Sequence, residues 1–242
     1  MIRLIILVLI FSIVPAWAES ANLLFDAGNT LIDTKALSSS VSLLLILTSI
    51  GFVPAFLMVT TSFLRFVIVL SMIRQALGTA QSPPNPVIVI LALFMTAYVM
   101  APVLSNVYET AIVPYNNGRI SQTEAFTLAT DPFHEFMLKQ ANDADIELFL
   151  DFSNTSIQDG EKIPLYVLIP AFVISELKAA FQIAFLIYLP FVVVDLLISN
   201  ILLTLGMFML SPAMVSMPFK FLLFILVDGW NLIVRGLLLS YQ

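Results

Sequence analysis

The 242-residue sequence contains no cysteine and a single histidine, so two of the commonest metal-ligand types are almost missing. Without cysteine the chain cannot form disulfides or thiolate metal sites in any compartment. Charge is scarce as well, because charged residues make up 11% of the chain and hydrophobic residues 60%. A soluble domain is about a quarter charged. We therefore predict that lipid or other apolar subunits cover much of the surface.

The acidic residues are unevenly distributed along a chain whose net charge is −6. Ten of the sixteen acids lie between Ser105 and Lys162, where three basic residues oppose them. Outside this stretch there are seven basic and six acidic residues. No basic patch is large enough to follow a nucleic-acid backbone, so we expect no nucleic-acid partner.

The N-terminus has the pattern of a secretory signal peptide. Arg3 is followed by an apolar h-region, Leu4–Val14, of eleven residues, and Ala16 and Ala18 form a small-x-small cleavage site. We predict cleavage between Ala18 and Glu19. The alternative is an uncleaved first membrane helix, but the apolar run is too short to span a bilayer.

Four apolar segments follow, and proline marks their interruptions. They cover residues 41–73, 87–107, 164–199 and 201–239. A kink is expected at Pro54, and the prolines around residue 84 form a turn that no helix crosses unbroken. The last two segments each exceed a single crossing, so their prolines predict helices that break, tilt or re-enter.

The predicted fold class is all-α, a polytopic membrane protein of long, Pro-broken helical hairpins with a small acidic periplasmic helical region. Arg74 and Lys220 lie near the two short turns, which positive-inside logic places in the cytoplasm, with the acidic loop in the periplasm. The expected divisions are a signal peptide (1–18), a periplasmic segment (19–40), a first apolar hairpin (41–108), the acidic helical region (109–163) and a second apolar hairpin (164–242).

The acidic stretch has the signals of short amphipathic helices. Ser121 and Glu124 form a capping box, and Asp131 followed by Pro132 resembles a second helix start. Apolar residues recur at helical spacing after both. We expect two or three helices whose solvated faces carry the acids.

The sequence offers little for catalysis or metal binding. His134 has no second histidine at zinc-helix spacing, so we expect a surface or capping role. There is no G-x-S-x-G motif and no phosphate-binding glycine loop. Asp195 and Asp228 could nominally pair as an intramembrane protease does, but neither has a suitable glycine-flanked setting. We expect no enzyme activity and no cofactor.

Charges inside apolar segments are more informative. Arg65, Glu176, Lys178 and Asp195 lie where an unpaired charge is costly, so they should face a bundle interior, a subunit interface or water. Glu176 and Lys178 are about 200° apart around a helix and need separate partners. We expect neighbouring copies to supply these partners; the alternative is a partner within one bundle.

Methionine is also clustered, with four of the ten between Met207 and Met217. A methionine cluster in an apolar segment is ordinarily lipid-facing or core filler. This one surrounds Gly206 and Pro212, and irregular backbone at membrane depth must be enclosed by protein or line a cavity. A ring of flexible thioethers would suit a seal that later admits an irregular chain.

Long stretches of the chain resemble the FliP family, the flagellar type III export-gate proteins related to the R subunits of virulence injectisomes. The resemblance covers nearly the whole mature chain. Ala184 stands where glycine is expected. The stretches that carry the resemblance are TSFLRFVIVLSMIRQALGTAQSPPNPV (61–87), EFMLKQANDADIELF (135–149), PAFVISELKAAFQIAFLIYLPFVVVDLLI (170–198) and LGMFMLSPAMVSMPFKFLLFILVDGW (205–230).

The resemblance implies a non-enzymatic pore subunit of the bacterial inner membrane, at the flagellar basal body. Roughly five copies would form a ring with FliQ and FliR, in contact with FlhB, that exports unfolded rod, hook and filament proteins. The hairpins would be lifted partly toward the periplasm, so that their helices need not cross the bilayer. The pore constriction maps onto Met207, Phe208 and Met209, with Phe208 where a further methionine is usual.

A different function is a small-molecule or proton-coupled transporter, with Asp195, Glu176 and Arg65 as a charge relay. An inverted internal repeat would favour it, and the sequence shows none.

Overall fold

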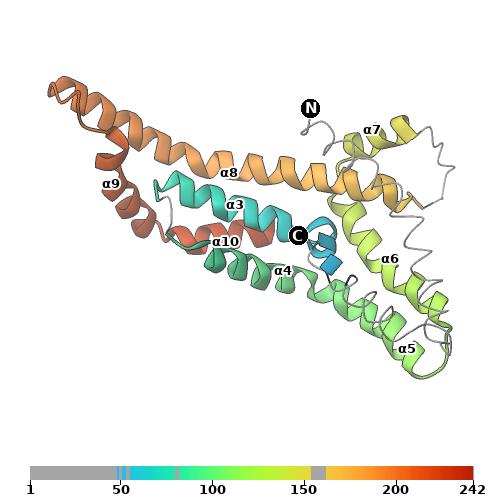
Figure 1. The fold of residues 1–242 in the computed structure, drawn as a ribbon. Coiled ribbons are helices and arrows are strands. Elements are labelled where there is room, and N and C mark those ends of the chain that lie inside the picture. The colour runs from blue at the N-terminus through green and yellow to red at the C-terminus, as the bar shows by residue number, and fades with distance from the viewer. Residues whose placement is uncertain (1–47, 49–50, 53–54, 80–81, 154–161, 242) are drawn as a thin grey trace.

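Figure 1 shows the computed structural model, which describes residues 48, 51–52, 55–79, 82–153 and 162–241. All regular structure within these ranges is helical, which confirms the predicted all-α class. The signal-peptide prediction, with Ala16, Ala18 and Glu19, and the kink at Pro54 lie outside the described residues.

The described helices form an elongated molecule along α8, which runs for 40 residues, or about 60 Å. Both hairpin turns lie toward one end, and the acidic helices lie at the other (Figure 1). The helices are α3 (Phe63–Ala76), α4 (Asn85–Val107), the π-helix η1 (Tyr108–Ile112), α5 (Val113–Asn116), α6 (Gln122–Gln140), α7 (Asp143–Ser153), α8 (Leu165–Thr204), α9 (Pro212–Leu226) and α10 (Gly229–Leu239).

The first hairpin consists of α3 and α4. Proline lies in the first turn of α4, where the backbone N–H that it lacks would have no partner within the helix. The helix therefore begins where the proline cluster predicts. The helical rod then continues through η1 and α5 as far as Asn116, beyond the predicted boundary at residue 108. The chain bends at Thr61 and Ser62, just before α3, within the segment expected to be one apolar run.

Of the break, tilt or re-entry expected from its prolines, the third apolar segment does not show a break. Helix α8 passes through both Pro170 and Pro190 without interruption. A proline removes one backbone hydrogen bond, but long apolar helices tolerate the loss because the bonds on either side keep the helix intact. The described part of the chain has two helices long and apolar enough to cross a membrane, Asn85–Asn116 and Leu165–Thr204.

The fourth apolar segment does break. Helices α9 and α10 meet at an angle of 64° after Asp228, which has a left-handed backbone with φ of 50°. A Cβ on Gly229 would lie 2.3 Å from the Phe224 ring, so only glycine allows this close approach.

The acidic helices agree with the prediction in part. The Glu124 N–H donates to Ser121 Oγ at 3.2 Å, which confirms the helix start at the capping box. The second predicted helix start, at Asp131 and Pro132, is wrong, because α6 continues through Pro132. The Asp131 side chain instead forms an ion pair with Lys162, with Nζ 2.8 Å from Oδ1. Packing of α6 against α4 and α8 overrides the local signal.

Helix α3 is the centre of the main core, between α8 and α4. Its fully buried residues include Phe66, Val69 and Leu70, and α10 adds Ile233 and Leu237. A smaller core lies between α6, α7 and α8. Its members are Met137, Ile146, Leu168, Ala171 and Phe172. Tight packing therefore concentrates in the middle and at the acidic end, whereas the far part of the α8–α9 hairpin is mostly exposed.

Candidate functional site

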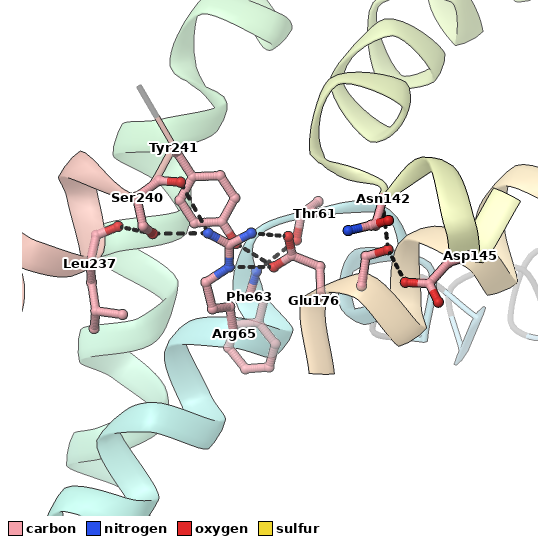
Figure 2. A network of polar contacts seen from close by, with 10 residues as sticks. Thr61, Phe63, Arg65, Asn142, Asp145, Glu176, Leu237, Ser240 and Tyr241 are labelled. Carbon is pink, nitrogen blue, oxygen red and sulfur yellow. Dashed lines mark hydrogen bonds and ion pairs between the residues drawn. The ribbon is translucent and has the colours of Figure 1, made fainter. Parts of the chain in front are cut away.

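Arg65 and Glu176 form a buried ion pair between α3 and α8 (Figure 2). The Glu176 residue is 0% exposed and Arg65 is 5% exposed. Arg65 Nε donates to Glu176 Oε2 at 3.0 Å, and Nη2 donates to the other carboxylate oxygen, so the contact is bidentate. The pair joins α3 to α8 across 111 residues of sequence.

The C-terminal segment completes this cluster. Arg65 Nη1 donates to the Ser240 carbonyl at 3.1 Å and to its hydroxyl at 2.9 Å. The Tyr241 hydroxyl donates to Glu176, and the Arg65 guanidinium lies 3.9 Å from the centre of the Tyr241 ring. Figure 2 shows both groups converging on the ion pair. The cluster therefore holds the end of the chain against α3 and α8.

A second cluster joins α7 to α8. Ser175 Oγ donates to Asp145 Oδ2 at 2.8 Å, and Lys178 Nζ forms an ion pair with the other oxygen. The Asn142 N–H donates to Ser175 Oγ at 2.8 Å. Burial alone would raise the pKa of Asp145, but the bonds from Lys178 and Ser175 and the charge of Lys178 hold that pKa below its ordinary value.

The lowered pKa of Asp145 gives the chain an acid-sensitive contribution to stability. The carboxylate stabilises the fold fully above the ordinary aspartate pKa, and this is lost as the pH falls through the lowered folded-state value. We expect Asp145→Asn to lower the unfolding temperature near neutral pH, with the difference from wild type shrinking in acid. The Lys178 side chain is 59% exposed, so screening keeps the effect small. A difference that persists unchanged into acid would contradict this assignment.

A third cluster lies toward the hairpin tip, between α8 and α9. Lys220 Nζ lies 2.6 Å from Asp195 Oδ2, and the Ser216 hydroxyl donates to Asp195 Oδ1. Lys220 is buried within α9, so it does not mark the turn near which the sequence placed it. The turn itself, residues 205–211, carries no charge.

The expectation that neighbouring copies pair with Glu176 and Lys178 is corrected by these contacts. Each has a separate partner, as their opposite helix faces predict, but Arg65 and Asp145 of the same chain supply them. Helices brought together by the two cores place the partners within reach. Sequence reasoning missed Ser240 and Tyr241, which follow an apolar helix with no local signal of a polar role.

The three residues suggested as a transporter relay are not brought together. Arg65 and Glu176 are paired, but Asp195 lies nineteen residues farther along the continuous helix α8, at a distance of about 28 Å. Its partners there are Lys220 and Ser216.

His134 is half-buried, and its Nε2 atom lies 2.7 Å from the Ile163 carbonyl. The contact ties α6 to the segment before α8, in place of the expected surface or capping role. No group of three His, Cys, Asp or Glu residues suited to a metal occurs within the described ranges.

The turn between α8 and α9 is built by glycine. Gly206 has φ of 73°, a conformation that other residues adopt only with strain. Its N–H donates to the Leu203 carbonyl at 3.1 Å and the Met207 N–H to the Leu202 carbonyl at 2.9 Å, which is a Schellman ending. The helix resumes at Pro212, so the chain is irregular between the two residues that the sequence singled out.

The side chains of this turn are apolar and exposed. Phe208 is 76% exposed and Met209 100%, while Met207 is partly covered. The turn lies at the far end of the molecule from the acidic helices (Figure 1). The exposed apolar surface continues down α8 through Val193, Leu189 and Phe185 at steps of four residues, which places them on one face of the helix.

The family model and the relatives that match this chain all bear the name FliP. A model of the FliP family matches residues 46–237. The flagellar biosynthetic protein FliP of Bacillus subtilis (strain 168) is 46% identical over 210 residues, covering 86% of this chain and 95% of that protein. The protein of that name from Pectobacterium carotovorum subsp. carotovorum is 47% identical, covering 84% of this chain and 79% of that protein.

A third relative bears the same name. The flagellar biosynthetic protein FliP of Aquifex aeolicus (strain VF5) is 44% identical over 209 residues, covering 85% of this chain and 87% of that protein. The matched region contains the ion pairs Arg65–Glu176, Lys178–Asp145 and Lys220–Asp195, together with the Met207–Met209 turn. The chain therefore belongs to the FliP family.

Proposed function

We propose that the chain is a subunit of the protein-conducting gate of the flagellar type III export apparatus. Roughly five copies form a ring with FliQ and FliR, in contact with FlhB, in the bacterial inner membrane. The acidic helices lie on the periplasmic side, and unfolded rod, hook and filament proteins pass through the ring. The names of the relatives, flagellar biosynthetic proteins, support the flagellar role.

The observation that carries the pore proposal is the exposed apolar turn at the tip of the α8–α9 hairpin. Met207, Phe208 and Met209 have few neighbours within the described part of the chain, although nothing charged lies in the turn. In a ring, the same turn of each copy is brought to the axis, where the side chains cover one another. A hydrophobic constriction of this kind excludes water and ions when closed.

The chemistry of the turn suits a varied cargo. Methionine side chains repack easily, so a ring of them can close without a substrate and yield to a chain of any sequence. Gly206 and Pro212 hold the ends of the turn, so the tip stays irregular. The buried clusters around Arg65 and Asp145 hold the rest of the chain in shape during passage.

We expect Met209→Ala to increase ion leakage through the gate, and the double variant Met207→Ala/Met209→Ala to increase it further. Export of flagellar proteins should remain largely intact, because smaller side chains open the seal without blocking the path. Leakage is measured with a membrane-potential dye in cells, or as conductance across a bilayer.

The matched control is Met214→Ala, which removes an exposed methionine from α9 outside the turn. It should leave leakage at the wild-type level. If both tip variants also match wild type, the seal lies elsewhere. A native mass measurement of the detergent-extracted complex tests the ring itself, and a stable monomer would refute it.

A further inference from the structure

Arg235 differs from the cations of the apolar helices that are paired with carboxylates, and from Arg74, which donates to the Asn85 side chain and the Pro83 carbonyl instead. Arg65, Lys178 and Lys220 each form an ion pair with a carboxylate of the same chain. Arg235, on α10, has no acidic side chain within ion-pair distance among the residues that the structure describes, and it is exposed. A guanidinium in an apolar segment needs a counter-charge, which must here come from outside the fold.

The Arg235 side chain lies in a groove of about 580 Å³ between α10 and α4. Tyr98 contributes from α4, and α10 contributes the remaining wall. The α10 residues that line the groove include Trp230, Asn231, Arg235, Leu238 and Leu239. The groove thus combines a polar pair, two aromatic rings and an apolar stretch.

The order of these residues along α10 matches an amphiphile. Asn231 and Arg235 are one turn apart on the same face, and Leu239 follows one turn later, about 6 Å farther along the axis. The opposite face of the helix, with Ile233 and Leu237, is already packed in the main core. The groove face is therefore available to a ligand with an anionic head and an apolar tail.

We propose that this groove binds an anionic phospholipid. Its phosphate contacts Arg235 and Asn231, and an acyl chain lies along Leu238 and Leu239. The planar guanidinium matches the geometry of a phosphate oxygen pair. Basic pockets between membrane helices bind phospholipid heads, and tyrosine and tryptophan are enriched where heads meet hydrocarbon.

A carboxylate from a second copy fits less well. Within the described apolar helices the acids are Glu176 and Asp195, which are already paired, Asp228 at the bend between α9 and α10, and Glu109 in η1, near the acidic end of the Asn85–Asn116 rod. The other described acids lie between residues 109 and 151, outside α8, α9 and α10. Lipid, in contrast, surrounds any exposed apolar helix in a membrane.

The test is native mass spectrometry of the full-length chain purified in its complex, with either phosphatidylglycerol or phosphatidylcholine of the same acyl chains. We expect retained phosphatidylglycerol and little phosphatidylcholine. Arg235→Gln should weaken phosphatidylglycerol retention about fivefold, or about 1 kcal/mol, the usual contribution of one basic residue near a lipid surface. Arg119→Gln is the matched control, because Arg119 is exposed in a turn outside the groove, and it should change nothing.

Three results would overturn the proposal. These are equal retention of the two lipids, unchanged phosphatidylglycerol retention by Arg235→Gln, and displacement of the lipid by excess glycerol phosphate, which has a head but no tail. If Arg235→Gln fails to fold, wild type is labelled with photoactivatable phosphatidylglycerol in vesicles. Labelling of 229–239 supports the site, and labelling only elsewhere refutes it.

The alternative occupant of the groove is a second protein chain, and it is tested by a photo-cross-linking residue in place of Trp230. A cross-link to lipid supports the proposal, whereas a cross-link to a protein chain shows that the groove is an interface. The inference does not rest on the ring, because the same mass spectra report copy number and bound lipid separately.

Discussion

Replacing Glu176 with alanine is expected to destabilise the folded chain by about 3–5 kcal/mol, because the Arg65 guanidinium then stays buried without its carboxylate. Arg65 would keep only the two bonds to Ser240 and its contact with the Tyr241 ring. The Tyr241 hydroxyl would lose its acceptor at the same time. The measurement is thermal unfolding of the purified chain in detergent.

Two variants separate the charge effect from loss of packing. Arg65→Met/Glu176→Leu removes both charges and keeps apolar volume, so it should be much more stable than Glu176→Ala. Asp131→Ala breaks an exposed ion pair, with Lys162, and should change stability by about 1 kcal/mol or less.

The same experiment distinguishes a role within the chain from a role between copies. If Glu176→Ala unfolds at the wild-type temperature and yet fails to assemble, the residue acts between subunits, as the sequence led us to expect. If the unfolding temperature falls before assembly is affected, the contacts seen here determine its role.

The second large effect is expected for Tyr241→Ala, which should destabilise the chain by about 3–5 kcal/mol, as for other buried aromatic residues. The ring stacks on Phe136 of α6 at a centroid distance of 6.0 Å and meets Phe66 of α3 edge-on at 5.4 Å. It also covers Arg65 and bonds to Glu176. One side chain therefore connects α6, α3 and α8.

Tyr241→Phe separates the two contributions, because it keeps the ring and removes only the hydroxyl. It should lose about 1.5–3 kcal/mol, the range for a hydrogen bond to a charged group. Tyr108→Ala, at an exposed tyrosine, should lie within about 0.5 kcal/mol of wild type. Equal losses for the alanine and phenylalanine variants would mean that the aromatic contacts contribute nothing.

The C-terminal residues thus have an unexpected place in the fold. Ser240 and Tyr241 lie beyond α10, yet they meet the central ion pair, which itself lies between α3 and α8. Ser175, next to Glu176 on α8, belongs to the cluster that holds α7. One short part of α8 therefore links the acidic helices, the first hairpin and the end of the chain.

Local sequence determined several features. Composition indicates membrane helices, because too few charges exist to cover a soluble surface. Ser121 and Glu124 mark a helix start, and Gly206 and Pro212 mark an irregular turn. These signals act within a few residues, through capping bonds and backbone angles, so neighbours in sequence suffice to show them.

Tertiary structure alone decided the partners of the buried charges and the course of the helices through proline. The sequence requires that Glu176 be neutralised, but Arg65 lies 111 residues away and becomes its partner only when α3 packs on α8. Likewise Pro132 and Pro170 carry the usual signal for a helix boundary, and the packed helices continue through both. Contacts distant in sequence contribute more free energy at these sites than the local preference does, and no local pattern records them.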